Sequence, residues 1–188
     1  MNATETAILN TRRAARWLPE ACYFYAQIPV ALSGWLRDRS SLTDRLRGCC
    51  KEPFSVQVVD QGWGNPALHE SRALGIQHGE RAMVREVLLM CGTRPTVFAR
   101  TVIPVRTLSG RERRLAFLGN RPLGAYLFTD PSMHRGAVEI SRLTAGNDIY
   151  QRAVSGLRKK PQTVWGRRSV FFLSDKPLLV SEFFLRLP

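Results

Sequence analysis

Hydrophobic residues recur at every second position in several short segments of the chain, a spacing typical of strands with one buried face. Residues 92–95 (Gly-Thr-Arg-Pro) separate two of these segments, and residues 174–177 (Ser-Asp-Lys-Pro) separate two more. Turns as short as these join antiparallel neighbours. The pattern predicts about six strands, at 55–60, 83–91, 96–105, 137–141, 169–173 and 178–187.

Three segments between the strands carry signals for helices. Residues 41–44 (Ser-Leu-Thr-Asp) and 109–112 (Ser-Gly-Arg-Glu) both fit a capping box, in which the serine oxygen accepts from a free backbone amide and the acid reaches back. The second of these helices is expected to end at Gly119, since glycine favours the left-handed cap. A further short helix is expected to begin at Pro122.

Helices placed between hairpins, without a regular strand–helix alternation, indicate an α+β fold. We expect one domain over residues 1–188, with an antiparallel sheet whose helices cover one face and the ligand pocket. A chain of 188 residues that is 44% hydrophobic can bury one such core without staples. Residues 1–20 are a candidate for a loosely ordered N-terminal extension, and 142–163 form a long basic connection.

Charge is the unusual bulk property, because 28 Lys and Arg against 15 Asp and Glu give a net charge of +13. A field of this sign favours an anionic partner, whether nucleic acid, a membrane surface, or a small carboxylate or phosphate. No segment approaches the ~20 apolar residues of a membrane span, and the N-terminus lacks the apolar core of a signal peptide. We therefore expect a cytoplasmic protein with no stable membrane insertion.

Cysteine and histidine give no sign of a metal site or a disulfide framework. The chain has no C-x-x-C pattern, its vicinal cysteine pair cannot easily close on itself, and its three histidines are scattered. We expect all four cysteines to be reduced and no metal to be bound. These residues are Cys22, Cys49, Cys50, Cys91, His69, His78 and His134.

Two charged residues lie on strand faces that are otherwise apolar. Glu182 shares its face of the last strand with apolar residues, as Arg85 does within 83–91. Unless its face is exposed, each needs a partner, because an isolated buried ion costs several kcal/mol. Arg85 and Glu182 could bridge each other or share a polar cavity. Their apolar companions are Leu178, Val180 and Phe184 for Glu182, and Met83, Val87 and Leu89 for Arg85.

Several phrases, read together, resemble the chorismate pyruvate-lyase family in order and spacing. They include Met83-Val-Arg-Glu-Val-Leu-Leu-Met-Cys91, Arg100-Thr-Val-Ile-Pro104, Arg121-Pro-Leu-Gly124, Trp165-Gly-Arg-Arg-Ser169 and Glu182-Phe183. Each phrase alone is weak, but about ten in register are specific. The resemblance is good over 83–188 and weak over the first 80 residues.

The resemblance implies a lyase that converts chorismate to 4-hydroxybenzoate and pyruvate, the first step of ubiquinone biosynthesis in Gram-negative bacteria, without a metal or organic cofactor. Chorismate carries two carboxylates, a ring hydroxyl and an enolpyruvyl ether. Loss of the ether group and of a neighbouring ring proton makes the ring aromatic, so much of the driving force is internal to the substrate. The protein mainly has to hold a flat dianion, exclude water and place one acid–base group.

The resemblance also implies which residues form the site. Arg85 matches the arginine that faces a carboxylate, and Glu182 matches the glutamate that meets the ring hydroxyl. An arginine fork binds a carboxylate through two parallel bonds, and a glutamate could accept or return a proton or only orient the hydroxyl. Leu123 and Leu42 match positions whose backbone contacts ligand. Arg100 either lines the pocket or its entrance or is a solvated strand residue.

The remaining basic residues leave alternatives open. We expect Arg167 and Arg168 to be a structural or surface pair rather than catalytic residues. The basic stretch 150–168 is a solvated loop by default, although it could guide the anionic substrate or transiently touch anionic lipid. Segments 36–48 and 109–128 are candidate covers of the pocket.

Two other functional classes are alternatives to the lyase. A nucleic-acid-binding module would fit the charge, but the chain lacks a recognisable motif for nucleic-acid recognition, so we expect the protein to bind no nucleic acid. A non-catalytic carboxylate sensor is the second alternative, because effector domains of some transcription regulators are similar in fold to this lyase family. No helix-turn-helix pattern precedes the domain, and we expect a monomeric enzyme whose partner is its small-molecule substrate.

Overall fold

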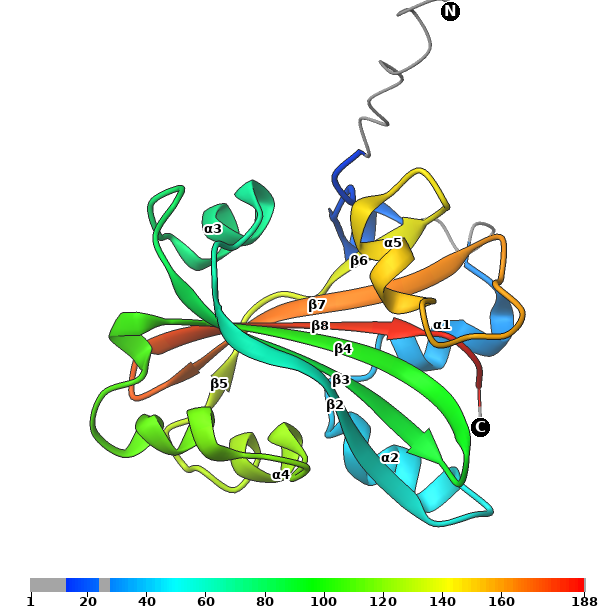
Figure 1. The fold of residues 1–188 in the computed structure, drawn as a ribbon, viewed down its shortest axis with the longest axis horizontal. Helices are drawn as coiled ribbons and strands as arrows, with labels where there is room; N and C mark the ends of the chain where they lie inside the picture. The colour runs from blue at the N-terminus through cyan, green and yellow to red at the C-terminus, as the bar shows by residue number, and fades with distance from the viewer. Residues whose placement is uncertain (1–12, 24–27, 188) are drawn as a thin grey trace, which may run out of the picture.

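The computed structural model describes residues 13–23 and 28–187, and within them the chain forms an α+β domain built on one antiparallel sheet (Figure 1). The fold class is confirmed, but the sheet has eight strands among these residues instead of about six. The strands are β1 (Leu18–Pro19), β2 (Phe54–Gly64), β3 (Ala82–Cys91), β4 (Arg94–Pro104), β5 (His134–Arg135), β6 (Glu139–Leu143), β7 (Val164–Leu173) and β8 (Lys176–Phe184).

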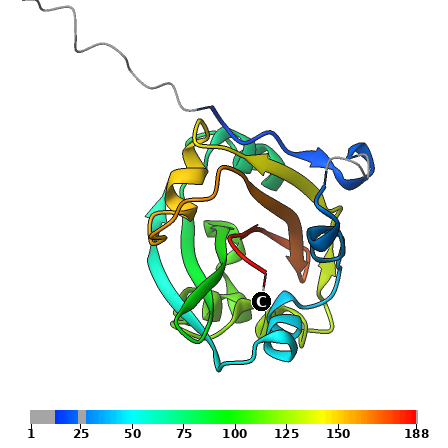
Figure 2. The ribbon, with the colours of Figure 1, turned by 90° about the vertical axis from the view of Figure 1, so that its right-hand side faces the viewer.

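The strands are ordered β1-β6-β7-β8-β4-β3-β2, and β5 pairs with β7 beside this path. Both predicted hairpins are present, as β3–β4 and β7–β8. Viewed at right angles to Figure 1, the sheet is strongly curved (Figure 2). The two strands missing from the prediction, β1 and β5, have two residues each, which is too short to show an alternation.

The start of β7 also differs from the prediction, since the strand begins at Val164 instead of residue 169. Gly166 and two arginines interrupt the apolar alternation there. Gly166 nevertheless belongs in the strand because it faces the ring of Phe183, and a Cβ at this position would lie 2.5 Å from that ring. Close packing thus explains a glycine that the pattern treats as a break.

All three predicted helical segments begin within one residue of the expected start. Ser41 caps α2, its hydroxyl accepting from the backbone N–H of Asp44 at 3.3 Å. The segment after Ser109 is a 3₁₀ helix without the predicted capping box, because the Ser109 hydroxyl donates to the backbone oxygen of Arg106 at 3.1 Å and Glu112 pairs with Lys176 at 2.7 Å. The helices are α1 (Val30–Leu36), α2 (Leu42–Cys49), α3 (Leu68–Leu74), α4 (Leu123–Leu127), α5 (Asp148–Ala153), and the 3₁₀ segments η1 (Glu20–Cys22), η3 (Val105–Thr107) and η4 (Gly110–Phe117).

Helices flank both faces of the sheet, which corrects the expectation that they cover one face only. In Figure 1, α2 and α4 lie on one side of the strands, while α3 and α5 lie on the other. The strand residues agree, because β4 and β8 bury apolar side chains on both faces. Periodicity could not assign the connections to a face, since it describes strands and not the path of the chain between them.

The core on the side of α2 and α4 consists of two clusters. Trp35, Leu36 and Leu46 of α1 and α2 belong to one, together with Val97 of the sheet. Residues of η4 and α4 pack over the other end of the same face in the second cluster. The two clusters flank the cavity described below.

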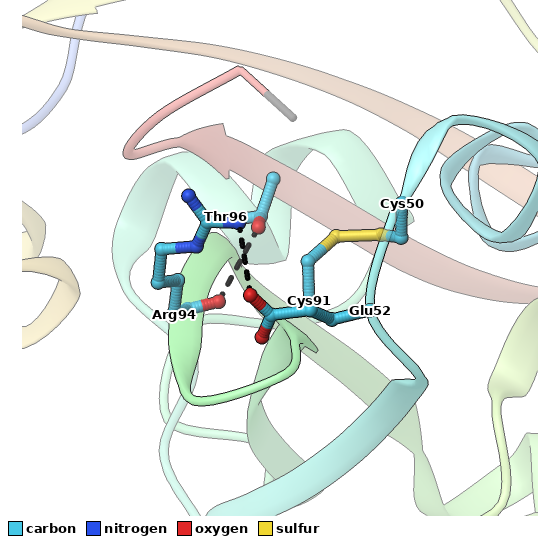
Figure 3. Close-up of a disulfide and its surroundings, with 5 residues drawn as sticks. All are labelled: Cys50, Glu52, Cys91, Arg94 and Thr96. Atoms are coloured by element: carbon cyan, nitrogen blue, oxygen red, sulfur yellow. Dashed lines mark hydrogen bonds and ion pairs between the residues drawn. A yellow bond between two sulfur atoms is a disulfide. The ribbon is translucent and has the colours of Figure 1, made fainter.

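Cys50 and Cys91 form a disulfide, with their Cα atoms 5.5 Å apart (Figure 3). The expectation that all four cysteines are reduced is therefore wrong for this pair, whereas Cys22 and Cys49 are free and exposed. The two bonded cysteines are 41 residues apart, so spacing along the chain gave no signal. They meet because β2 pairs with β3 and places Phe54, four residues after Cys50, opposite Cys91.

The N-terminal end of the described chain contacts the sheet. Residues 1–12 of the expected extension lie outside the described residues, while Leu18 pairs with Ile140 of β6. The long basic connection contains the end of β6 and the helix α5, and it is irregular between α5 and β7.

Candidate active site

A cavity lies between the sheet and the helices α2 and α4. Alternate residues of β3, β4 and β8 form its floor, and the starts of α2 and α4 form its roof. Its polar groups include Arg85, Arg135, Arg167 and Glu182; its apolar lining residues include Leu42, Val87, Leu89, Leu123, Leu127, Phe171 and Val180.

Gly124 brings the two roof helices together. A Cβ at this position would lie 3.1 Å from the hydroxyl of Thr43 and 3.3 Å from that of Ser41, so a larger residue would push α4 away from the start of α2. Pro122 was expected to be the first residue of this helix; it is instead the N-cap, with an extended backbone, and α4 begins one residue later. The roof therefore depends on close contact between two short helices.

Arg85 lies on the pocket face of β3 and is 2% exposed. Its Nη2 donates to the backbone oxygens of Gly119 at 2.8 Å and Arg121 at 3.1 Å. Its Nε is buried without a hydrogen-bond partner, and no carboxylate of the described residues forms an ion pair with it. Burial lowers the pKa of Arg85. An unpaired buried donor of this kind calls for an acceptor from a ligand.

Glu182 lies on β8 opposite Arg167 of β7. Nε of Arg167 donates to Oε2 of Glu182 at 2.6 Å. Arg167 is 1% exposed, and its Nη1 also donates to the backbone oxygens of Trp35 and Asp38. Glu182 keeps 17% of its side-chain surface exposed, so the carboxylate is anchored on one side and open on another.

The two charges at the centre of the prediction do not bridge each other. Arg85 is opposite Thr101 of β4, and Glu182 is opposite Ala99 of the same strand. One strand therefore lies between them, which at about 4.8 Å per strand spacing separates the two backbones by roughly 10 Å. Both side chains line the same cavity, as the shared-cavity alternative requires.

Leu42 and Leu123 also line the cavity, each as the first residue of a helix, α2 and α4 respectively. Backbone amides at such positions have no acceptor within their own helix. The sequence-based expectation that these two residues contact ligand through the backbone is compatible with this placement. Ligand contact at these residues stays a prediction.

Arg100 lies on the opposite face of the sheet and does not line the cavity. Nε and Nη2 of Arg100 donate to Glu70 at 2.7 and 2.9 Å, and Nη1 donates to Glu86 at 2.7 Å. Neither sequence-based alternative, a pocket residue or a solvated strand residue, describes this paired and largely buried position. On β4, the side chain of Arg100 points to the face opposite that of its neighbours Ala99 and Thr101, which line the cavity.

Arg167 and Arg168 do not form a pair, because neighbours on a strand point to opposite faces. Arg168 binds Glu139 at 2.7 Å on the face away from the cavity. Sequence reasoning missed Arg167 as a site residue, although its place opposite Glu182 in the final hairpin was a usable signal. It also missed Arg135, whose two-residue strand β5 carries no periodic signal.

No group of three or more His, Cys, Asp and Glu side chains able to hold a metal occurs in residues 13–23 and 28–187. The cavity itself offers one carboxylate, paired with arginine, and no histidine or cysteine. Within the same described residues, no helix combines the length and the hydrophobicity needed to cross a membrane.

The fold and the cavity indicate a class of protein: an α+β domain with a small-molecule site lined by arginines and one glutamate. The family model for chorismate lyase matches residues 12–188, and the chain belongs to this family. A protein of Nitrosospira multiformis named "Probable chorismate pyruvate-lyase" is 38% identical over 178 residues, covering 94% of this chain and 96% of its own. One of the same name from Azoarcus sp. (strain BH72) is 46% identical, covering 82% and 83%.

Solved structures of transcription regulators are similar in fold. PhnF from Mycobacterium smegmatis has a TM-score of 0.56 at 12% identity, covering 79% of this chain and 65% of its own. A GntR-family regulator from Enterococcus faecalis has a TM-score of 0.52 at 14% identity, covering 73% and 93%. At this identity the likeness concerns the fold alone.

Proposed function

We propose that this protein is a chorismate lyase, which converts chorismate to 4-hydroxybenzoate and pyruvate and so starts ubiquinone biosynthesis. Family membership over nearly the whole chain supports this activity. The observation that carries it to the site is the cavity between α2, α4 and the sheet, where Arg85 and Glu182 face the same space from strands two positions apart.

Arg85 is proposed to bind the ring carboxylate. The backbone oxygens of Gly119 and Arg121 fix one edge of its guanidinium, and the buried Nε still lacks an acceptor. A charge-assisted bond to a carboxylate would satisfy that donor and compensate the buried charge. Glu182, at the other end of the cavity, is proposed to meet the ring hydroxyl.

The reaction breaks the ether bond between the ring and the enolpyruvyl oxygen and removes the ring proton on the neighbouring, hydroxyl-bearing carbon. The ring becomes aromatic, and the enolpyruvate takes up a proton to give pyruvate. Glu182 is the group proposed to accept the ring proton, while Arg167 holds its carboxylate in place at 2.6 Å. The closely packed roof of α2 and α4 supports exclusion of water during the elimination.

The protein is further proposed to act as a cytoplasmic monomer that binds neither nucleic acid nor membrane stably. Chorismate is a dianion that crosses a bilayer poorly, so its enzyme is expected in the compartment where chorismate is made.

Turnover tests the proposed function directly. Purified, metal-stripped protein incubated with chorismate should release 4-hydroxybenzoate and pyruvate in equal amounts, followed by chromatography and by a pyruvate-coupled assay. Tight binding of 4-hydroxybenzoate without any turnover would instead favour the carboxylate sensor. Retardation of DNA or RNA with a steep dependence on salt, and no turnover, would favour the nucleic-acid-binding alternative.

A further inference from the structure

The charges that line the cavity do not balance. Three guanidinium groups, those of Arg85, Arg135 and Arg167, face the single carboxylate of Glu182, and the other lining residues carry no charge. Arg167 and Glu182 neutralise each other in their ion pair. Arg85 and Arg135 are left as two uncompensated positive charges, which matches a ligand with two negative charges.

Arg135 is held in place by neutral groups. It lies on β5 opposite Phe171 of β7, and its guanidinium carbon is 5.0 Å from the centre of that ring. Its Nε donates to Oγ of Ser169 at 3.0 Å, and its Nη1 donates to the backbone oxygen of Asp38 at 3.3 Å. These contacts orient the guanidinium, and Nη2 makes no hydrogen bond to another described residue.

The nearest acids do not compensate this charge. The carboxylate of Asp38 pairs with Arg45 at 2.7 Å, and that of Glu182 pairs with Arg167. Burial, followed by the positive charge of Arg167, lowers the pKa of Arg135 to about 10, although Glu182 and Asp38 act in the opposite direction. The guanidinium of Arg135 is thus largely buried without an acidic partner of its own, and an anionic ligand would supply the missing negative charge.

We infer that Arg135 forms a second carboxylate subsite, which binds the enolpyruvyl carboxylate of chorismate, while Arg85 binds the ring carboxylate. This inference rests on the proposed function. In chorismate the ring carboxylate and the hydroxyl are on opposite carbons of the ring, and the ether is next to the hydroxyl. A substrate with its carboxylate on Arg85 and its hydroxyl on Glu182 therefore places the enolpyruvyl group near Glu182. Arg135 lines this part of the cavity, because it donates to the same backbone oxygen of Asp38 as Arg167, the partner of Glu182.

The subsite also has a consequence for the reaction. As the ether bond breaks, its electron pair moves to the enolpyruvyl oxygen, and negative charge develops on the departing enolpyruvate. A guanidinium on that fragment stabilises this charge. The product 4-hydroxybenzoate retains only the ring carboxylate, so its binding depends on Arg85 and not on Arg135.

Substrate and product together test the inference. In Arg135→Gln, kcat/KM for chorismate should fall about 10²-fold or more, while the Kd of 4-hydroxybenzoate, measured by calorimetry, should stay within about threefold. Arg85→Gln should weaken both. Arg135→Lys should restore part of the loss, because it returns the charge without the fork. Arg142→Gln, an exposed arginine of β6 outside the cavity, controls for the loss of one positive charge.

Unchanged chorismate kinetics in Arg135→Gln, or an equal loss of chorismate and 4-hydroxybenzoate binding, would overturn the subsite. Wild-type protein provides a measurement that needs no variant to fold. The stable aromatic compound 3-(carboxymethoxy)-4-hydroxybenzoate carries both carboxylates and should bind at least tenfold more tightly than 4-hydroxybenzoate. Equal affinities would refute the inference, whereas absence of turnover by the wild type would refute the proposed function and leave this comparison of affinities valid.

Discussion

The two faces of the sheet treat buried charge in opposite ways. On the face of α3 and α5, Arg100 is bound by Glu70 and Glu86, and Glu86 also binds Arg152 at 2.7 Å. On the face of α2 and α4, Arg85 is bound by backbone oxygens only. The same strands contribute to both faces through alternate residues. Buried charge alone therefore does not mark a binding site; a buried charge that the protein leaves without a counterion does.

The direction of the pKa shifts expresses the same difference. Burial opposes the charge of Arg100, but the hydrogen bonds and charges of Glu70 and Glu86 outweigh it and raise the pKa of Arg100. For Arg85 burial acts without compensation, and the pKa falls. Among the described residues, acids of the protein pair with Arg100 on one face, whereas no acid pairs with Arg85 on the other face and a ligand would have to supply the negative charge.

Substitution of the acid on the pocket face should have the largest effect. Glu182→Gln keeps the size of the side chain and an oxygen that can accept from Arg167, but the amide cannot take up a proton. We expect kcat for chorismate to fall by about 10²- to 10⁴-fold, the usual contribution of a general acid–base group. Steady-state kinetics on protein whose fold is checked by circular dichroism would measure this.

The matched control is Glu139→Gln. Glu139 also pairs with a strand arginine, Arg168, but on the other face, and its side chain is 31% exposed. We expect its kcat to remain within about twofold of the wild type. If both variants, or neither, lose turnover, Glu182 has no special role in proton transfer, and the distinction between the faces is wrong at this residue.

Removal of the disulfide should have the second largest effect, because the disulfide ties the end of α2, part of the pocket roof, to the sheet. For a separation of 41 residues, the chain-entropy model gives about 4 kcal/mol of stabilisation. Cys50→Ser should lower the free energy of unfolding in urea by about this amount. Cys49→Ser changes the exposed free neighbour and should leave it unchanged; equal stability of the two variants would contradict the prediction.

The sequence was sufficient for the elements that carry a clear alternation. It predicted both hairpins, the capped start of α2, and the faces on which Arg85 and Glu182 lie, because strand parity depends only on neighbouring residues. The resemblance to the lyase family then favoured a shared ligand cavity over a salt bridge between them. The structure agrees with the cavity, with β4 lying between the two residues.

What the sequence did not predict depends on contacts between distant segments. The pairing of Cys50 with Cys91 needs the register of β2 on β3, and the partners of Arg100 come from α3 and β3. Arg135 enters the cavity from a two-residue strand, where no periodicity can be detected. In each case the decisive neighbour is 14 or more residues away along the chain, and only the fold brings it near.

The smallest of these effects concerns the closed network on the other face. Glu70→Gln removes one of the two acids that compensate Arg100, and we expect a loss of about 3 kcal/mol in unfolding free energy at pH 7. This is the lower end of the cost of breaking a buried pair, because Arg100 keeps Glu86. Turnover per folded molecule should stay within about threefold of the wild type, since Glu70 does not line the cavity.

The dependence of this loss on pH sharpens the test. Burial raises the pKa of Glu70, but the hydrogen bonds and positive charge of Arg100 outweigh this effect and lower the pKa below its ordinary value of 4.5. A depressed carboxylate pKa stabilises the fold above the unfolded-state pKa, and this contribution disappears as the pH falls through the folded-state pKa. The stability difference between wild type and Glu70→Gln should therefore be constant near neutral pH and narrow below about pH 4.5. Glu80→Gln, which removes an acid without an ion pair among the described residues, should show no such narrowing. If the stability difference between wild type and Glu70→Gln stayed constant into acid, the ion pair of Glu70 with Arg100 would not stabilise this face.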